Sequence, residues 1–191
     1  MYFLSKPEPD EIRTFLSTQK DQSFSYEHVG ASRDRPPGGY TTDHNHMRLG
    51  EGEEVFARAV KAIRQWKMFD MPWIQLCWPD APIEEGTTVA VLVSHLGFWS
   101  LNASRIVYVI EQDGSDKKFG FAYGTLVQHA ERGEERFSVE FHSQDHSVWY
   151  DVCAFSRPSF VARLAYPLTR ALQKRFARDS MSGMQKAVDN S

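Results

Sequence analysis

The sequence of 191 residues has only two cysteines, little net charge and no long apolar run. Cys77 and Cys153 lie far apart and match no metal-binding or redox spacing, so we expect two reduced core residues of a cytosolic protein. The longest apolar run, residues 87–96, is about half of the ~20 residues that a membrane-spanning helix needs. These absences exclude a disulfide scaffold and a helical membrane protein, and they predict a soluble, cytoplasmic chain.

Motifs for nucleotide or metal chemistry are also missing from the sequence. No Walker loop, dinucleotide-binding glycine motif, nucleophile elbow or catalytic-cysteine signature is present, so no cofactor is expected and no reaction class stands out. A net charge of −3 excludes a protein that is basic throughout, and nucleic acid is not an expected partner. His44 and His46 form a His-x-His pair, but the spacing supplies no third ligand, so we expect surface histidines and no metal site.

Apolar periodicity predicts one α+β domain over the whole chain. We expect an N-terminal helix and loop (1–50) that includes a strand at 24–29, a helix at 51–68 ended by Pro72, antiparallel strands over 72–156 and a C-terminal helix at 158–187. Short turns between the strands require antiparallel pairing, and the apolar stripe of the last helix is the natural cover for the sheet. The prediction is a curved antiparallel sheet of six or seven strands gripping this helix, with a kink or a break at Pro167 and a frayed tail after Met184.

Several motifs together resemble one protein family. They are FGFAYGTL at 119–126, GEERF at 133–137, AFSRP at 154–158 and QKRF at 173–176. With further matches they extend from about Tyr26 to Met184, and the sequence resembles the DUF1990 family of uncharacterised proteins. This resemblance implies no catalytic residues, because the family has no assigned activity.

The order of elements also resembles the helix-grip, START-like (SRPBCC) superfamily, whose members bind lipids and other apolar ligands or catalyse cyclisations on them. That likeness implies a cavity between the sheet and the C-terminal helix, although fold alone does not fix function. Core packing explains most of the aromatic residues between Trp66 and Phe155, and some of them can line such a cavity. Small residues at 120, 122 and 124 permit close approach by the helix or by a ligand. The leading interpretation is a protein that binds a small, largely apolar ligand with a polar or anionic end.

The candidate ligand-binding residues are Trp99, Asn102, Tyr123, His129, Glu134 and Arg157. Strand alternation places Asn102 and Arg105 on opposite faces, and we favour Asn102 as the inward residue because a buried amide can anchor a ligand. Arg157 can hold a ligand carboxylate or phosphate, or it can pair with Glu134 or Glu135.

Two other functions remain open at this point. His129 beside Glu134 can take part in proton transfer, which would make the protein an enzyme of the same fold; a solvated turn with internally paired charges is the simpler explanation. The stretch from Arg157 to Arg178 contains six cations and no acid. A basic C-terminal helix of this kind can contact a membrane surface or another protein, although a solvated helix face is simpler.

Overall fold

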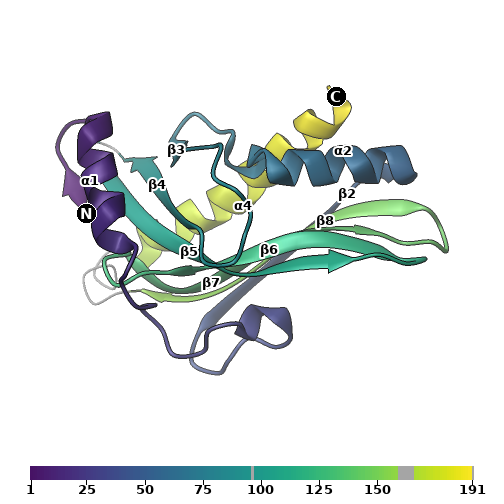
Figure 1. The fold of residues 1–191 in the computed structure, drawn as a ribbon, viewed down its shortest axis with the longest axis horizontal. Coiled ribbons are helices and arrows are strands. Elements are labelled where there is room, and N and C mark those ends of the chain that lie inside the picture. The colour runs from purple at the N-terminus through teal and green to yellow at the C-terminus, as the bar shows by residue number, and fades with distance from the viewer. Residues whose placement is uncertain (96, 159–165, 191) are drawn as a thin grey trace.

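A computed structural model describes residues 1–95, 97–158 and 166–190 (Figure 1). The described helices, 3-10 turns and strands are β1 (Tyr2–Phe3), α1 (Pro9–Gln19), η1 (Ala31–Arg33), β2 (Thr41–Glu51), α2 (Glu53–Arg64), η2 (Lys67–Phe69), β3 (Ile74–Cys77), β4 (Thr88–Ser94), β5 (Trp99–Gln112), β6 (Lys117–Thr125), β7 (Glu131–Phe141), β8 (Ser147–Pro158) and α4 (Tyr166–Asp189).

The strands form one antiparallel sheet in the order β2-β8-β7-β6-β5-β4-β3, and β1 pairs with β5. Helices α2 and α4 lie on one face of this sheet, and the segment that contains η1 lies on the other (Figure 1). We call these the helix face and the outer face. The predicted α+β class, with a curved antiparallel sheet and a long C-terminal helix, is confirmed, and the sheet curls as a half-barrel.

Aromatic side chains at alternate positions of β6 and β7 form the core on the helix face. Phe121 and Phe137 are fully buried, and their ring centroids lie 5.5 Å apart. Phe69 from η2 and Phe176 from α4 pack over them, with ring centroids 5.8 Å and 6.3 Å from that of Phe137. Full burial of a side chain of this size stabilises a fold by roughly 1.5–3 kcal/mol. This cluster therefore helps to fix where η2 and α4 sit on the sheet.

The second helix ends earlier than the sequence predicts. After α2, Trp66 adopts a left-handed backbone with a φ of 55°, which breaks the helical path before Pro72. Its side chain is 2% exposed, and its indole N–H donates a hydrogen bond to the Ala81 carbonyl at 2.9 Å. The predicted end at Pro72 is wrong because the packing of this one side chain overrides helical periodicity.

The predicted strand at 24–29 is absent. Phe24 makes an isolated bridge with Leu126, and the segment that follows crosses the outer face (Figure 1). Gly124 permits close approach there, because a Cβ at this position would lie 2.1 Å from the Tyr26 hydroxyl oxygen. Gly124 therefore accommodates the N-terminal segment rather than the C-terminal helix or a ligand. The polar stretch that comes next forms β2, which pairs with β8 at the edge of the sheet.

The last helix, α4, is described from Tyr166 onward, and residues 159–165 lie outside the described part of the chain. Pro167 is the second described residue of this helix, and since the residues before Tyr166 lie outside the described part, the expected kink or break at Pro167 stays a prediction. The predicted frayed tail is wrong, because Met184 and Val188 are 0% and 1% exposed. None of the described helices is long and apolar enough to cross a membrane.

Strands β7 and β8 are longer than predicted, and this determines where their side chains point. Residues 131–134, which are charged and contain a glycine as turns often do, form the first part of β7, and Arg157 lies near the end of β8. Side chains alternate between the two faces of a strand. Odd positions of β7, such as Phe137, face the helices, and even positions therefore face outward.

Candidate functional site

A cavity of about 710 Å³ lies between the helix face and α4. Its apolar walls include Phe69, Val91 and Phe176. Leu4 and Leu168 also border it, and since they are 93% and 54% exposed they mark its mouth. Small-molecule sites typically have volumes of ~300–1,000 Å³ and mostly apolar walls with a few polar groups. The cavity has the size and the lining of such a site.

Glu135 of β7 is one of the polar groups in this cavity. Tyr123, its cross-strand neighbour on β6, donates a hydrogen bond from its hydroxyl to Glu135 Oε2 at 2.9 Å. Burial raises the pKa of Glu135 to about 8; the Tyr123 hydrogen bond opposes this shift, and the carboxylates of Glu131 and Asp43 add to it. At neutral pH the Glu135 carboxyl is therefore mostly protonated.

Two further carboxylates line the same cavity and connect it to α4. Glu131 Oε1 accepts a hydrogen bond from Gln173 Nε2 at 2.8 Å, and burial raises the pKa of Glu131. Asp43 of β2 pairs with both terminal nitrogens of Arg170, with 2.7 Å between Nη2 and Oδ1. Arg170 thus compensates the charge of Asp43, whereas the contact to Glu131 comes from a neutral amide. The described residues that line the cavity include no lysine or arginine.

Four of the six predicted site residues, Asn102, Tyr123, His129 and Glu134, border this cavity, although the Glu134 carboxylate is bound elsewhere. Asn102 Nδ2 donates to the Ser100 hydroxyl at 3.1 Å, and its Oδ1 accepts the Ala130 N–H at 3.3 Å. His129 Nδ1 accepts the N–H of residue 131 at 3.0 Å. Burial lowers the pKa of His129 to about 4, so its imidazole is neutral at physiological pH. As predicted, Asn102 rather than Arg105 faces the helices.

The carboxylate of Glu134 points to the outer face, although the residue also borders the cavity. Its Oε2 accepts hydrogen bonds from the Tyr26 hydroxyl and the Gly30 N–H, both at 2.7 Å. Its Oε1 accepts the N–H of Ser32 at 3.0 Å and also the Ser32 hydroxyl. The structure therefore does not bring Glu134 together with His129. The carboxylate holds the N-terminal segment against the sheet, and we do not retain it as a ligand anchor.

Trp99 and Arg157 also lie on the outer side of their strands. The ammonium of Lys6 lies 5.7 Å from the ring centroid of Trp99, and the Arg157 guanidinium lies 4.8 Å from that of Tyr40. Strand alternation is the reason in both cases: Trp99 is three residues from Asn102, so the two side chains point in opposite directions. Neither residue lines the cavity.

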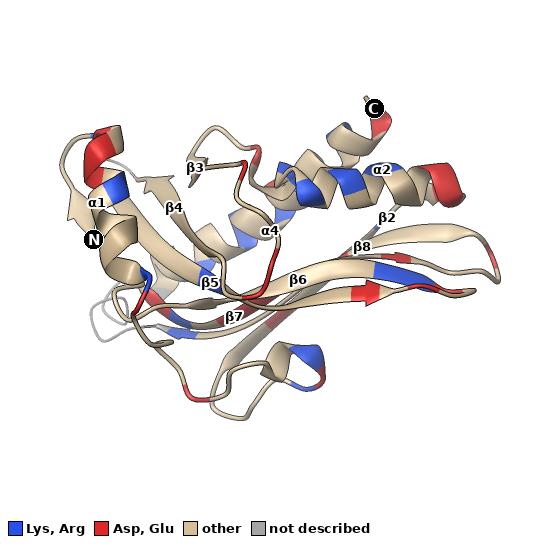
Figure 2. Ribbon diagram, viewed as in Figure 1, with Lys and Arg blue, Asp and Glu red and all other residues tan. Residues whose placement is uncertain are grey.

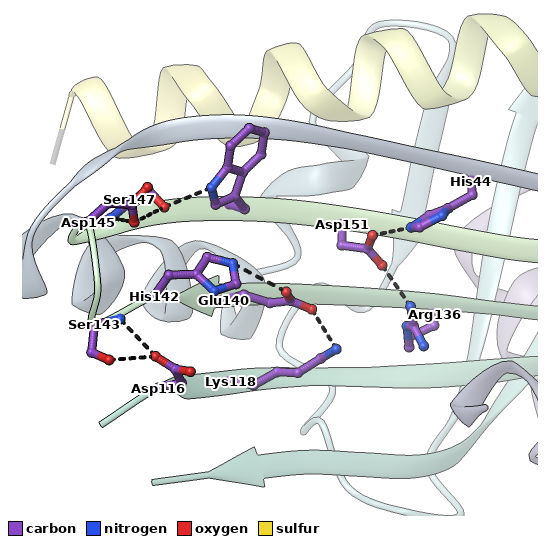
Figure 3. A network of polar contacts seen from close by, with 11 residues as sticks. His44, Asp116, Lys118, Arg136, Glu140, His142, Ser143, Asp145, Ser147 and Asp151 are labelled. Atoms are coloured by element: carbon purple, nitrogen blue, oxygen red, sulfur yellow. Dashed lines mark hydrogen bonds and ion pairs between the residues drawn. The ribbon is translucent and has the colours of Figure 1, made fainter. Parts of the chain in front are cut away.

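The outer face carries a network of charged residues, part of which Figure 3 shows. Arg136 Nη2 lies 2.9 Å from Asp151 Oδ1, and His44 contacts the other oxygen of the same carboxylate (Figure 3). Lys118 pairs with Glu140 on the same face. Arg136 and Lys118 thus lie on the outer face, whereas Lys117 pairs with Glu53 of α2 on the helix face. Within the described residues, no group of three or more His, Cys, Asp or Glu side chains is placed to hold a metal ion.

The polar residues of the cavity that the sequence analysis did not name as ligand-binding residues include Asp43, Glu131, Glu135 and Gln173. A signal for Glu135 is present in the sequence, because Phe137, Val139 and Phe141 alternate toward the core and the same alternation reaches Glu135. For Gln173 and Asp43 no such signal exists, since their positions depend on how α4 and β2 pack on the rest of the sheet.

Comparisons with known proteins agree with this architecture. The DUF1990 family, described as a domain of unknown function, matches residues 25–183. A UPF0548 protein of Dictyostelium discoideum is 34% identical to this chain, with 98% of this chain and 96% of that protein covered. A UPF0548 protein of Deinococcus radiodurans is 36% identical, with 93% and 94% covered.

Two solved structures have a similar fold. The crystal structure of Ara h 8.0201 has a TM-score of 0.50 at 14% identity and covers 80% of this chain and all of its own. A hypothetical protein, jhp0584 from Helicobacter pylori, has a TM-score of 0.50 at 12% identity, with 78% and 89% covered. At such low identity these likenesses show the helix-grip fold alone.

Proposed function

The chain belongs to the DUF1990 family, and from this premise and its helix-grip fold we propose that it binds a small, largely apolar ligand between the sheet and α4. One observation carries the proposal: a cavity of about 710 Å³ whose walls are mostly rings and aliphatic side chains. Cores normally pack to a density that leaves few voids larger than a water molecule. A space of this size under a covering helix is therefore best explained by a ligand.

The polar end of this ligand is proposed to lie near Asn102, Tyr123 and His129, which all border the cavity. These groups offer an amide, a hydroxyl and a neutral imidazole as hydrogen-bond partners. An anionic end, which the sequence analysis allowed through Arg157, loses its support. Arg157 lies on the outer face, and the described lining contains carboxylates but neither lysine nor arginine.

The two alternative functions have weaker support. Proton transfer by His129 and Glu134 requires the two groups to converge, and the Glu134 carboxylate is taken up by the N-terminal segment. The basic character of α4 (Figure 2) is partly neutralised, since Asp179 pairs with Arg175 and Arg178. Arg163, which contributed to the predicted basic helix, lies outside the described residues. We therefore retain the ligand-binding proposal alone.

A fluorescent apolar probe tests the proposal directly. N-phenyl-1-naphthylamine is uncharged at pH 7.5, and we expect saturable binding with a rise in its emission. Ala177→Trp on α4 places a large ring in the cavity and should reduce probe binding at least about tenfold. Ala171→Trp is the matched control, because Ala171 is an exposed residue of the same helix.

Two results would overturn the proposal. One is the absence of saturable probe binding by the unmodified protein. The other is unchanged probe affinity in Ala177→Trp while circular dichroism shows the native fold, since the probe would then bind elsewhere.

A further inference from the structure

We propose that the polar end of the ligand is a protonated amine, and that Glu135, with Glu131 beside it, is the group that recognises it. This inference rests on the proposed function, because it names the chemical class that the cavity selects. It concerns the charge of the ligand head and not the shape of its apolar body.

The first line of support is the sign of the charges around the cavity. Four acidic residues line it, Asp43, Glu131, Glu134 and Glu135, although the Glu134 carboxylate is bound by the N-terminal segment, and no lysine or arginine lines it within the described residues. Arg170 compensates Asp43 in a two-point ion pair and also acts on Glu131, so Glu135 is the glutamate of β7 on which no cation acts. A carboxylate or phosphate head would meet repulsion here, and a cationic head would meet attraction.

The second line of support is the state of Glu135 itself. Its Oε2 accepts the Tyr123 hydroxyl at 2.9 Å, whereas Oε1 has no hydrogen-bond partner among the described residues. The side chain is partly buried, and its accessible part borders the cavity. Oε1 is therefore open to a hydrogen-bond donor on a ligand in the cavity. An ammonium group offers up to three donors and a full opposite charge.

The pKa values agree with this geometry. Burial raises the pKa of Glu135 to about 8, with Glu131 and Asp43 adding to the shift, and it also raises the pKa of Glu131. The other titratable neighbours, Tyr123 and Tyr150, have raised pKa values too, chiefly because of burial, and therefore supply no positive charge. The charged form of Glu135 thus lacks a cation, which an ammonium group would provide.

Other occupants fit these groups less well. A metal ion needs several ligands in close array, and no group of three or more candidate metal ligands occurs within the described residues. A neutral hydroxyl can donate one hydrogen bond to Glu135 but cannot compensate its charge. The rings of Phe69 and Phe176 above the site favour an apolar body on the same molecule. The chemical class is therefore an apolar organic amine.

Three probes with the same body and different heads test the inference. They are 4-phenylbutylamine, 4-phenylbutanol and 4-phenylbutyrate, each measured by displacement of N-phenyl-1-naphthylamine at pH 7.5. We expect the amine to bind at least about tenfold more tightly than the alcohol, and the carboxylate to bind most weakly. Glu135→Gln should lower amine affinity at least about tenfold and change alcohol affinity less than about threefold.

The control variant is Glu140→Gln, which removes a carboxylate from the outer face of the same strand and should change none of the three affinities. If all three probes bind and the amine is not preferred, the amine inference is overturned while ligand binding stands. If neither the naphthylamine nor any of the three binds, the proposed function itself fails and the inference with it. The order of the three probe affinities in the unmodified protein tests the amine preference even if Glu135→Gln does not fold.

Discussion

Replacing Glu134 with alanine should strongly destabilise the fold, because this carboxylate holds the N-terminal segment on the outer face. Glu134 is 2% exposed and accepts four hydrogen bonds, from Tyr26, Gly30 and, twice, Ser32. Alanine leaves these donors without their acceptor, and each buried unmatched donor costs ~1–3 kcal/mol. Relaxation of the loop reduces the sum, so we expect a loss of about 3–5 kcal/mol in the free energy of unfolding.

Urea unfolding followed by tryptophan fluorescence measures this loss, which corresponds to a fall of roughly 6–20 °C in Tm for a chain of this length. Glu140→Ala is the matched control, since Glu140 lies on the same strand and face in a partly exposed pair with Lys118, and should cost about 1 kcal/mol or less. A loss below about 1 kcal/mol for Glu134→Ala would refute the reasoning. So would a folded Glu134→Ala variant that no longer binds the naphthylamine probe, because Glu134 would then belong to the ligand site.

Three further predictions concern pH and close packing. Because the folded-state pKa of Glu135 is raised to about 8, the native state holds its proton more tightly than the unfolded state, and stability should fall as pH rises from 6.5 to 8, by up to ~1.4 kcal/mol per unit. Glu135→Gln should remove much of this slope in urea titrations; His129, with a pKa lowered to about 4 from 6.5, acts in the opposite direction near pH 6.5, and this contribution is the same in both proteins. Binding of 4-phenylbutylamine at pH 7 should release up to about one proton, visible as a different calorimetric enthalpy in Tris and phosphate, and equal enthalpies after correction would contradict the Glu135 contact. Gly120→Ala should cost more than about 2 kcal/mol, because its Cβ would lie 2.3 Å from the Phe137 carbonyl oxygen, whereas Gly38→Ala has nothing within 4 Å and should be close to neutral in the same thermal assay.

Local apolar periodicity predicted much of the fold correctly. The alternation in β6 and in the second half of β7 placed Phe121 and Phe137 correctly on one face, and short turns made antiparallel pairing the only possible arrangement. The same alternation placed Asn102 inward and Arg105 outward. These features depend on neighbours a few residues apart, and the sequence shows such neighbours directly.

The start of β7 shows where local reasoning failed. Its first residues are charged and contain a glycine, which is typical of a turn, yet they form a central strand because both of its faces find partners. Glu131 meets Gln173 of α4, and Glu134 meets the segment around Ser32. Both partners lie tens of residues away in the sequence. The strand propensities of these residues give no information on contacts with residues so far away in the sequence.

The path of residues 24–40 was unpredictable for the same reason. This segment has no helix or strand periodicity of its own apart from η1, and its position on the outer face follows from contacts with Glu134 and Arg136. Arg136 Nη1 donates to the Ser32 carbonyl at 2.8 Å. The sequence analysis gave Glu134 a ligand role because a glutamate close to a histidine looks the same in a sequence whether its carboxylate binds a ligand or holds a loop.

Glu134 and Glu135 are adjacent in sequence but lie on opposite faces of the sheet, and this separates stability from recognition. Glu134 is fully satisfied by backbone and hydroxyl donors, so its removal should lower stability without changing which head group the cavity prefers. Glu135 keeps one oxygen without a partner among the described residues, so its neutralisation should alter head-group preference and should not destabilise the fold at pH 8. Measuring both variants for both properties tests this division. If Glu134→Ala changed amine preference, or Glu135→Gln unfolded the protein, the assignment of one face to folding and the other to binding would be wrong.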